Sequence, residues 1–337
     1  MKRRITAFAL ALLTMAVFGL TGCAQIQKWW ASPIQEEDEE NPEEDLAVLP
    51  FTEKSERTEK VTLFFQYLDE PYLADDTRNV TIKANERIES IVIEELIRGP
   101  SSDKADLQPL FQPDTKVLGV SDNQKIFFVT LSKEFLSVPA EVPSNWEQDE
   151  QWAEEIYRQR RLAIQSLVCA ITEMGKYSQV QIQVDVDGSG EGKRITRKEA
   201  GFTGNNEDNV LGPQTRPESL LLTPSLTVKT ALNYFSRKEW GSLYQYVAAQ
   251  DTSNIPRPSL EDMESTFSAN DITLREFQVL SEHVSGDGQR ATVSISYSIR
   301  TSDGQTRESA ATPVRLVREN EVWKIAYPAL ENLFLDQ

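Results

Sequence analysis

Residues 160–186, RRLAIQSLVCAITEMGKYSQVQIQVDV, join a helical pattern directly to a strand pattern. We expect the helix to run from about Asp149 to Met174, with Gly175 just past its end. Its apolar stripe recurs at helical spacing and comprises Ile164, Leu167, Val168 and Ile171. The strand alternates apolar with polar residues, and its apolar members are Val180, Ile182, Val184 and Val186. A long helix that leads straight into a half-buried strand predicts a layered α/β domain.

The segments before this pair extend the same pattern. A first strand alternates over residues 61–67, and a helix from Ile88 stops at Gly99-Pro100, where it cannot continue. Two further strands, 117–120 and 126–131, flank a polar turn at 121–124. The order ββαββαβ predicts one α/β domain over residues 61–203.

The remainder of the chain has a different order of elements. Residues 204–224 are rich in glycine, asparagine and proline, and we expect them to link two domains. Within residues 225–337 helical patterns come first, at 228–235, 240–247 and 259–267. Strand patterns follow at 272–281, 290–300 and 313–325, the last one broken into a hairpin at Glu319-Asn320. Helices followed by an antiparallel sheet predict a cone-shaped α+β domain.

Residues 1–22 have the composition of a secretory signal peptide. The positive charges of Lys2, Arg3 and Arg4 precede an uncharged run that is too short and too early to favour a transmembrane span. This run ends in Leu20-Thr21-Gly22-Cys23, which resembles the bacterial lipobox. The resemblance implies cleavage before Cys23, lipidation of its thiol, palmitate included, and anchoring at the extracytoplasmic face of the cell membrane. The alternative, a buried N-terminal helix with a free thiol, lacks an amphipathic pattern.

Residues 23–60 are expected to form the lipidated N-terminus and an acidic, disordered tether. Eight of the ten positions from Glu36 to Asp45 are carboxylates, and such a block repels itself and stays extended. It can act as a spacer or as an acidic ligand for a basic partner or Ca²⁺. The whole chain has 35 Lys+Arg against 53 Asp+Glu, a net charge of −18. Because nucleic-acid binding needs a basic footprint, we expect no nucleic-acid partner.

Five segments of the first predicted domain resemble the GerMN domain of bacterial sporulation and germination lipoproteins. They occur in the family's order, at Val61–Phe65, Thr77–Val80, Glu95–Pro100, Val129–Phe135 and Val184–Gly188. The resemblance implies a fold similar to ring-building modules, an extracytoplasmic assembly role and no active site. Thr130 departs from the aspartate more common in the family, and the hairpin at 188–192 is longer and rich in glycine.

The second predicted domain resembles the nuclear-transport-factor-two-like cone. The resemblance is carried by the helical pattern that ends near Trp240 and by the terminal Glu321-Val322-Trp323-Lys324-Ile325. It implies either an accessory module or a domain that encloses a ligand pocket.

Histidine and cysteine are too few for most metal or nucleophile chemistry. One His and two Cys exclude a four-ligand zinc site of these residues, and lipidation of Cys23 leaves no disulfide within the chain. We expect Cys169 to pack inside the long helix and His283 to lie near a strand end. Residues 185–191 imitate the start of a calcium loop, but Thr196 stands where that loop needs a bidentate Glu. We therefore predict no catalytic residue, no metal and no cofactor.

Arg78 and Arg98 are the residues that we single out as a possible partner surface. A strand-end salt bridge and a helix stop explain them equally well. We expect a membrane-anchored, non-enzymatic module that docks onto envelope or peptidoglycan-associated proteins in sporulation, germination or cell-wall maintenance. Two alternatives stay open, namely a peptidoglycan hydrolase or modifying enzyme that uses carboxylates, and a small-ligand sensor that uses the C-terminal cone.

Overall fold

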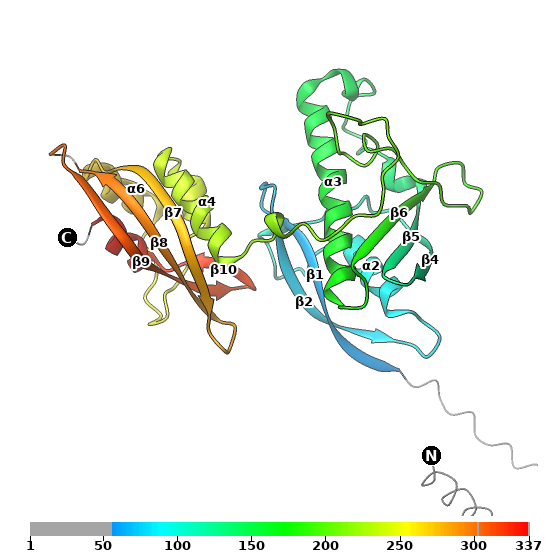
Figure 1. The fold of residues 1–337 in the computed structure, drawn as a ribbon, viewed down its shortest axis with the longest axis horizontal. Coiled ribbons are helices and arrows are strands. Elements are labelled where there is room, and N and C mark those ends of the chain that lie inside the picture. Colours follow the sequence, from blue (N-terminus) through cyan, green and yellow to red (C-terminus); the bar gives the residue numbers. More distant parts are fainter. Residues whose placement is uncertain (1–55, 302, 336–337) are drawn as a thin grey trace, which may run out of the picture. The chain divides into compact units, whose positions relative to one another are not determined.

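The computed structural model describes residues 56–301 and 303–335. The predicted signal peptide, the lipobox Leu20–Cys23 and the acidic block lie outside the described residues, so they stay predictions. Lys54–Gln337 group together as one structural unit. Its described part contains three β-sheets with flanking helices (Figure 1). The mixed α/β composition agrees with the sequence prediction.

Strand β1 (Arg57–Tyr67) is the centre of the first sheet. It pairs antiparallel with β2 (Leu73–Ile82) on one side and with β3 (Leu107–Gln108) on the other. The second half of β1 is buried, because α2 (Ile88–Arg98) and α3 (Glu150–Glu173) both contact it. Gly99 ends α2 with a φ of +95°, which confirms the predicted helix stop.

The second sheet contains the predicted hairpin and a parallel pair. β4 (Val117–Asn123) and β5 (Ile126–Ser132) are antiparallel, whereas β5 and β6 (Gln179–Asp185) are parallel. Helix α3 supplies the crossover that a parallel connection requires. Two short 3₁₀ turns, Lys133–Leu136 and Trp146–Gln148, precede it. Asp149 caps α3 by accepting hydrogen bonds from the N–H groups of Gln151 and Trp152.

The second half of α3 is the centre of the first core. Its contacts with β1 and with β6 place it between the two sheets, as Figure 1 shows. The side chains buried there include the predicted stripe and its neighbours: Leu162, Ala163, Ile164, Ser166, Leu167, Val168, Cys169, Ala170 and Ile171. The helix is therefore buried on several sides, beyond the single stripe that the sequence indicates.

The chain after β6 pairs repeatedly with the first two sheets. Val184 and Lys193 exchange backbone hydrogen bonds, and Val180 and Gln214 do the same. Past a 3₁₀ turn at Glu218–Leu220, the N–H of Leu222 donates to the carbonyl of Leu73. Residues 204–224, expected to be a linker, thus hydrogen-bond to β6 and β2. The domain boundaries at 203 and 225 stay predictions.

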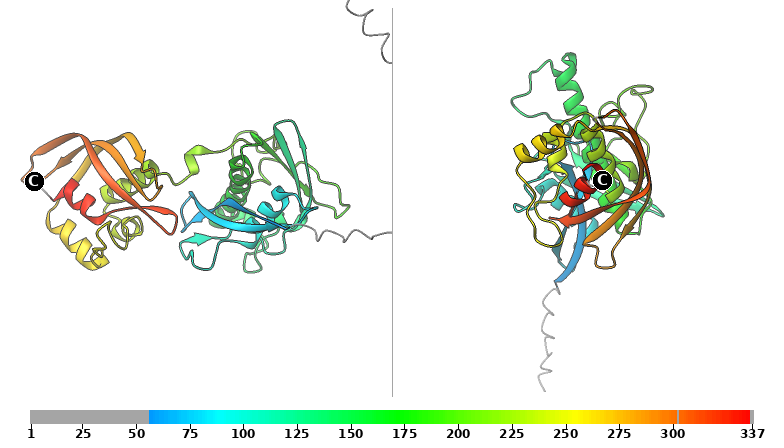
Figure 2. Two further views of the ribbon diagram at one scale, coloured as in Figure 1. Left: turned by 90° about the horizontal axis from the view of Figure 1, so that it is seen from below. Right: turned by 90° about the vertical axis from the view of Figure 1, so that its left-hand side faces the viewer.

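The C-terminal part consists of helices packed on one antiparallel sheet. Its helices are α4 (Pro224–Ser236), α5 (Trp240–Gln245), α6 (Leu260–Ala269) and α7 (Tyr327–Phe334). Its strands are β7 (Thr273–Val284), β8 (Arg290–Arg300), β9 (Thr306–Glu319) and β10 (Val322–Ile325), in the order β10-β9-β8-β7. The sheet is curled (Figure 2), and α4 and α7 contact its strands. Bulges in the β7–β8 and β8–β9 pairings accompany this curl.

Two C-terminal elements differ from the sequence prediction. Strand β9 begins at Thr306, whereas the sequence pattern predicted Pro313. The first half of the strand was not predicted because it is mostly exposed and polar and shows no alternation. Helix α7 was not predicted, although Ala329, Leu330, Leu333 and Phe334 recur at helical spacing and are buried. The predicted break at Glu319-Asn320 is confirmed as the turn between β9 and β10.

Gly201→Ala is expected to destabilise the fold by about 2–4 kcal/mol. Gly201 has a φ of +83°, and a Cβ built there would lie 2.0 Å from the carbonyl oxygen of Tyr157 in α3. Urea unfolding measures the loss. Gly188→Ala is the matched control, because Gly188 has a φ of +73° with no atom near its Cβ position. It should lose only about 1 kcal/mol. Equal losses would contradict the close approach.

Candidate functional site

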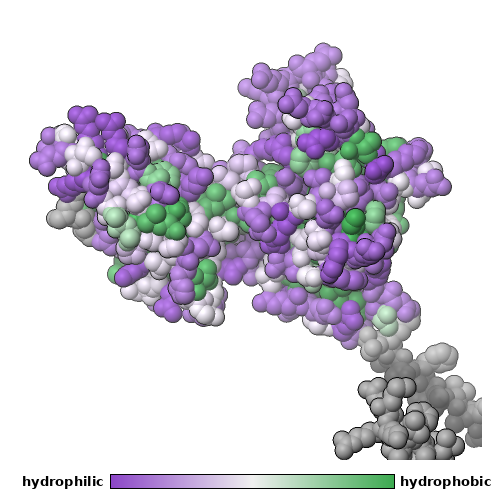
Figure 3. Space-filling model, viewed as in Figure 1, coloured by the Kyte–Doolittle hydropathy of each residue, from purple (hydrophilic) through white to green (hydrophobic). Residues whose placement is uncertain are grey.

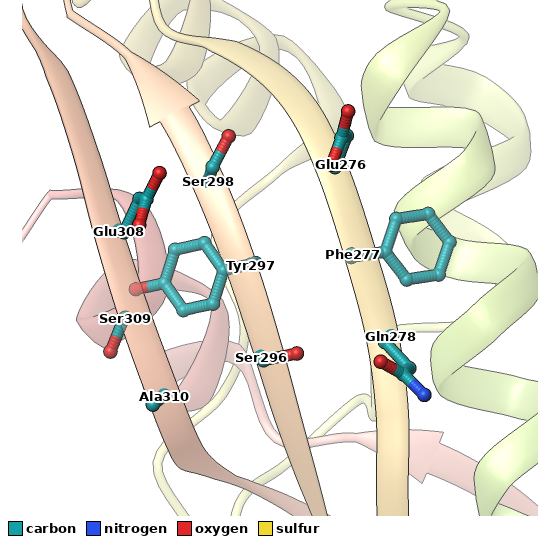
Figure 4. Close-up of a pocket in the computed structure, with 9 residues that line it drawn as sticks. All are labelled: Glu276, Phe277, Gln278, Ser296, Tyr297, Ser298, Glu308, Ser309 and Ala310. Carbon is teal, nitrogen blue, oxygen red and sulfur yellow. The ribbon is translucent and has the colours of Figure 1, made fainter.

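An open hollow of about 820 Å³ lies on the C-terminal sheet. Figure 4 shows the side chains that line it on β7, β8 and β9. They are Glu276, Phe277, Gln278, Ser296, Tyr297, Ser298, Glu308, Ser309 and Ala310. The hollow is therefore formed by the sheet itself and is lined mainly by polar residues.

Strand register arranges the polar groups in rows. Glu276 on β7 pairs with Ser298 on β8, which pairs with Glu308 on β9. Gln278 and Ser296 form the row two residues farther along, which faces the same side of the sheet. Side chains in neighbouring rows alternate between the two faces of a sheet. The intervening Tyr297 lies toward α7, since its hydroxyl donates to the carbonyl of Leu333 at 2.9 Å.

The polar groups of the hollow are free to bind a ligand. Within residues 56–301 and 303–335, no side-chain hydrogen bond or ion pair involves Glu276, Gln278, Ser296, Ser298 or Glu308. Two carboxylates, two hydroxyls and an amide can accept and donate hydrogen bonds to a polar small molecule. A hydrolytic nucleophile needs a hydrogen-bonded base, and neither serine has one among these residues. The hollow therefore offers hydrogen-bonding groups to a polar ligand.

Arg78 and Arg98 lie at one ion-pair cluster but differ in exposure. Arg78 donates to Glu95 at 3.0 Å and to the carbonyl of Gly99 at 3.1 Å, and it contacts Asp76. Its side chain is only 17% exposed, and its guanidinium lies over the ring of Phe65. Arg98 pairs with Glu95 but is 68% exposed. Arg78 therefore ties β2 to the end of α2, and of the two arginines only Arg98 is largely exposed.

A second charged cluster, which sequence reasoning missed, surrounds Glu89 at the start of α2. The buried Glu89 carboxylate accepts from Tyr177 Oη at 2.7 Å, from Lys176 Nζ at 3.0 Å and from Arg87. Arg87 also donates to Asp122 at 2.6 Å. Burial raises the pKa of the Glu89 carboxyl, but the hydrogen bonds from Arg87, Tyr177 and Lys176 outweigh it and lower the pKa to about 2. The charged groups of this cluster pair with one another, and they connect the start of α2 to β4 and to the segment before β6.

Residues 185–191, which resemble the start of a calcium loop, form a hydrogen-bonded turn in the structure. The Asp185 carboxylate accepts from the N–H groups of Ser189 and Gly190, at 3.0 and 2.9 Å. Asp187 accepts from Ser189 and pairs with Lys193. These bonds are those of a tight polar turn, which explains the acids and glycines of the segment without a metal ion. Among the residues that the structure describes, no group of three or more His, Cys, Asp or Glu is placed to hold a metal ion.

Cys169 and His283, the two remaining candidates for a nucleophile or base, lie on different elements, α3 and β7. Cys169 is fully buried, and burial raises the pKa of its thiol to about 12. His283 is exposed on β7, paired across the sheet with Thr292. Neither residue contributes to the hollow. Both positions agree with the sequence expectations.

The molecular surface offers no broad apolar area on the face drawn in Figure 3. Hydrophilic side chains dominate that face, and hydrophobic ones gather in small areas. The large apolar residues that are exposed come from scattered positions: Leu118, Val186, Val210, Ile255, Leu260, Leu280 and Val284. In the described stretches, no helix combines the length and apolarity needed to cross a bilayer.

The family comparison assigns the first two sheets to a known domain. Residues 62–188 match the family model named Germane, described as sporulation and spore germination. The matched span runs from β1 to just beyond β6. The chain therefore carries a GerMN-like domain, of a family linked to sporulation and germination. A comparison with curated proteins gives no match.

Solved structures similar to this chain include three relevant ones. The tandem GerMN domains of the sporulation protein GerM from Bacillus subtilis share 16% identity, cover 49% of this chain and 48% of that one, and give a TM-score of 0.33. A putative lipoprotein from Clostridium perfringens shares 20%, with coverages of 46% and 87% and a TM-score of 0.26. The first GerMN domain of GerM shares 15%, with 47% and 98% and a TM-score of 0.28. The chain thus spans about half the length of the tandem-domain structure.

Glu89→Gln is expected to remove a pH-dependent part of the stability. Because the pKa falls from 4.5 to about 2 on folding, the ionised carboxylate stabilises the fold fully above pH 4.5 and progressively less as the pH falls toward 2. At about 1.4 kcal/mol per pKa unit, the contribution is about 3 kcal/mol. Denaturant unfolding at pH 7 and pH 3 should show the variant losing less on acidification. Glu94→Gln, exposed on the same helix, is the control. Identical pH dependence in wild type and Glu89→Gln would refute the assignment.

Proposed function

We propose that this protein is a membrane-anchored, extracytoplasmic interaction module of the cell envelope that acts in sporulation or germination. The observation that carries the proposal is the match of residues 62–188 to the sporulation and germination family. Its partners are envelope or peptidoglycan-associated proteins. Arg98 and the polar surface around it offer an exposed place for such a partner.

The anchor follows from the lipobox-like Leu20-Thr21-Gly22-Cys23. Several acyl chains on Cys23 give a membrane affinity that one chain does not. The acidic block from Glu36 to Asp45 then spaces the folded part from an anionic lipid surface, because like charges repel.

A non-enzymatic role is supported by the state of the reactive groups. The thiol of Cys169 is buried and protonated, and the carboxylates near Arg78 and Arg87 are committed to ion pairs. Catalysis by a carboxylate pair needs one group held protonated and free near substrate. Hydrogen bonds from Arg87, Tyr177 and Lys176 instead lower the pKa of the Glu89 carboxyl to about 2, which keeps it ionised.

Cys23→Ala should abolish lipid labelling and release the chain from the membrane. Cells grown with radiolabelled palmitate are fractionated, and the label and the protein are followed in the membrane pellet. Cys169→Ala is the matched control, since it removes the only other cysteine, and it should keep both label and pellet localisation. Undiminished labelling of Cys23→Ala would disprove the anchor. Crosslinking in sporulating cells should then recover envelope proteins with the wild type.

A second candidate function is small-ligand sensing through the C-terminal part, whose fold we propose to be nuclear-transport-factor-two-like. The hollow of about 820 Å³, with five polar side chains that have no side-chain partner among residues 56–301 and 303–335, favours it. Its carboxylates, hydroxyls and amide suit a hydroxyl-rich or amine-bearing ligand such as a wall fragment.

Soluble muropeptides should shift the NMR amide signals of β7, β8 and β9 around the hollow, and Ser298→Trp should weaken this binding at least tenfold by filling it. Thr292→Trp, on the same strand outside the hollow, should leave binding unchanged. Absence of any shift at millimolar fragment would remove this candidate. Release of muropeptides from intact peptidoglycan would favour the hydrolase alternative.

A further inference from the structure

The hairpin formed by β9 and β10 contacts the first sheet and the loop before β3 through three ion pairs. Arg318 contacts Asp75 on β2. Glu321 accepts from Lys104 at 3.2 Å, and Lys324 pairs with Asp106 at 3.1 Å. In each of these pairs the hairpin residue carries the charge opposite to that of its partner. The two surfaces are therefore complementary in charge.

Lys324 is the most deeply buried member of this contact. Its residue is 4% exposed, and its Nζ donates to Tyr67 Oη at 2.5 Å and to the carbonyl of Gln245 at 2.6 Å, besides Asp106. Burial lowers the pKa of the ammonium, while Asp106 opposes this shift. All three ammonium protons have acceptors, which is the condition under which a buried lysine is tolerated.

Glu321 reaches the backbone of an edge strand. Strand β2 lies at the outside of the order β2-β1-β3, so one row of its backbone groups faces away from the sheet. The N–H of Thr77 belongs to that row and donates to Glu321 Oε2 at 2.9 Å. Farther along β2, the carbonyl of Leu73 accepts from the N–H of Leu222. The outer edge of β2 is therefore occupied at two positions.

The geometry of the hairpin tip holds Glu321 in place. Asn320 and Glu321 both have positive φ angles, +51° and +69°, as a tight two-residue hairpin turn requires. Glu319 also accepts from the N–H of Ala249 at 2.7 Å, which ties the base of the tip to the C-terminal part. The carboxylate of Glu321 is thus delivered to β2 by a short, constrained turn.

We propose that the β9–β10 hairpin is a charge-held latch that covers the outer edge of β2 and withholds it from strand addition by an extended segment of a partner chain. Open strand edges pair readily with extended peptides through backbone hydrogen bonds. The ion pairs of Arg318 and of Glu321 retain 12–29% side-chain exposure, so salt and a competing charged partner can reach them. Release of the latch frees the N–H of Thr77 for a new strand.

The test is NMR hydrogen exchange on the full mature chain in detergent micelles. Glu321→Ala removes the acceptor of the Thr77 N–H and the partner of Lys104. The Thr77 amide should exchange at least tenfold faster, while the midpoint of global unfolding stays near that of the wild type. Glu308→Ala, on β9 but away from the contact, should leave the Thr77 amide unchanged. Unchanged Thr77 exchange in Glu321→Ala would overturn the latch.

Salt and a second variant separate a latch from general destabilisation. Raising NaCl from 0.05 to 1 M should speed Thr77 exchange in the wild type and have little further effect in Glu321→Ala. Lys324→Met keeps the side-chain volume, loses the three donated bonds and should give the same local acceleration. Acceleration of amides throughout α3 as well as β2 in either variant would show global loosening, and the proposal would fail.

Discussion

The architecture depends on burying the second half of α3 against two sheets at once. One side contacts β1 and another contacts β6, and the parallel pairing of β5 with β6 is possible only because this helix makes the crossover. The chain beyond β6 then closes over the same helix. Arg161 donates to the carbonyl of Gly201, and Arg216 donates to the carbonyl of Cys169 at 3.1 Å. Arg216 belongs to the segment with the composition of a linker, so this segment is bonded to the backbone of the helix, which composition does not reveal.

Local sequence patterns predicted the helices and strands that have a regular period. They did not predict which strands pair over long distances in the sequence. The strand at 126–131 and the helix from Asp149 to Met174 were predictable because their periods are regular and their ends carry Asp149 and Gly175. β3 was missed because Leu107–Gln108 is too short to show any period. The first half of β9 was missed because it is paired on one side by β8 yet faces solvent with Arg307, Glu308 and Ala310.

The candidate sites show why residue type alone does not give a site. The charge of Arg78 suggests a surface residue, but ion pairs with Asp76 and Glu95 hold its side chain at only 17% exposure. The residues of the hollow carry no motif. Their only signal is the alternation of hydroxyls in β8, at Thr292, Ser294, Ser296 and Ser298, which marks a solvent-facing side of a central strand. The neighbours Glu276 and Glu308 come from strands whose register is set by bulges, and register shifts of this kind are absent from the sequence pattern.

Strand β9 runs from the hollow to the β9–β10 hairpin. Any effect of ligand binding in the hollow on the hairpin contact would pass along this strand. Glu308 and Arg318 are ten residues apart on this strand, about 33 Å at the usual rise, so no ligand in the hollow touches the contact with β2. A ligand can then affect the hairpin only if it binds the latched and released states with different affinity. Ala311, at a φ of +58°, lies at the bulge between them, where the strand is least constrained by its pairing with β8. Motion of β9 as a rigid element would transmit binding, whereas bending at Ala311 would absorb it and leave the two features independent.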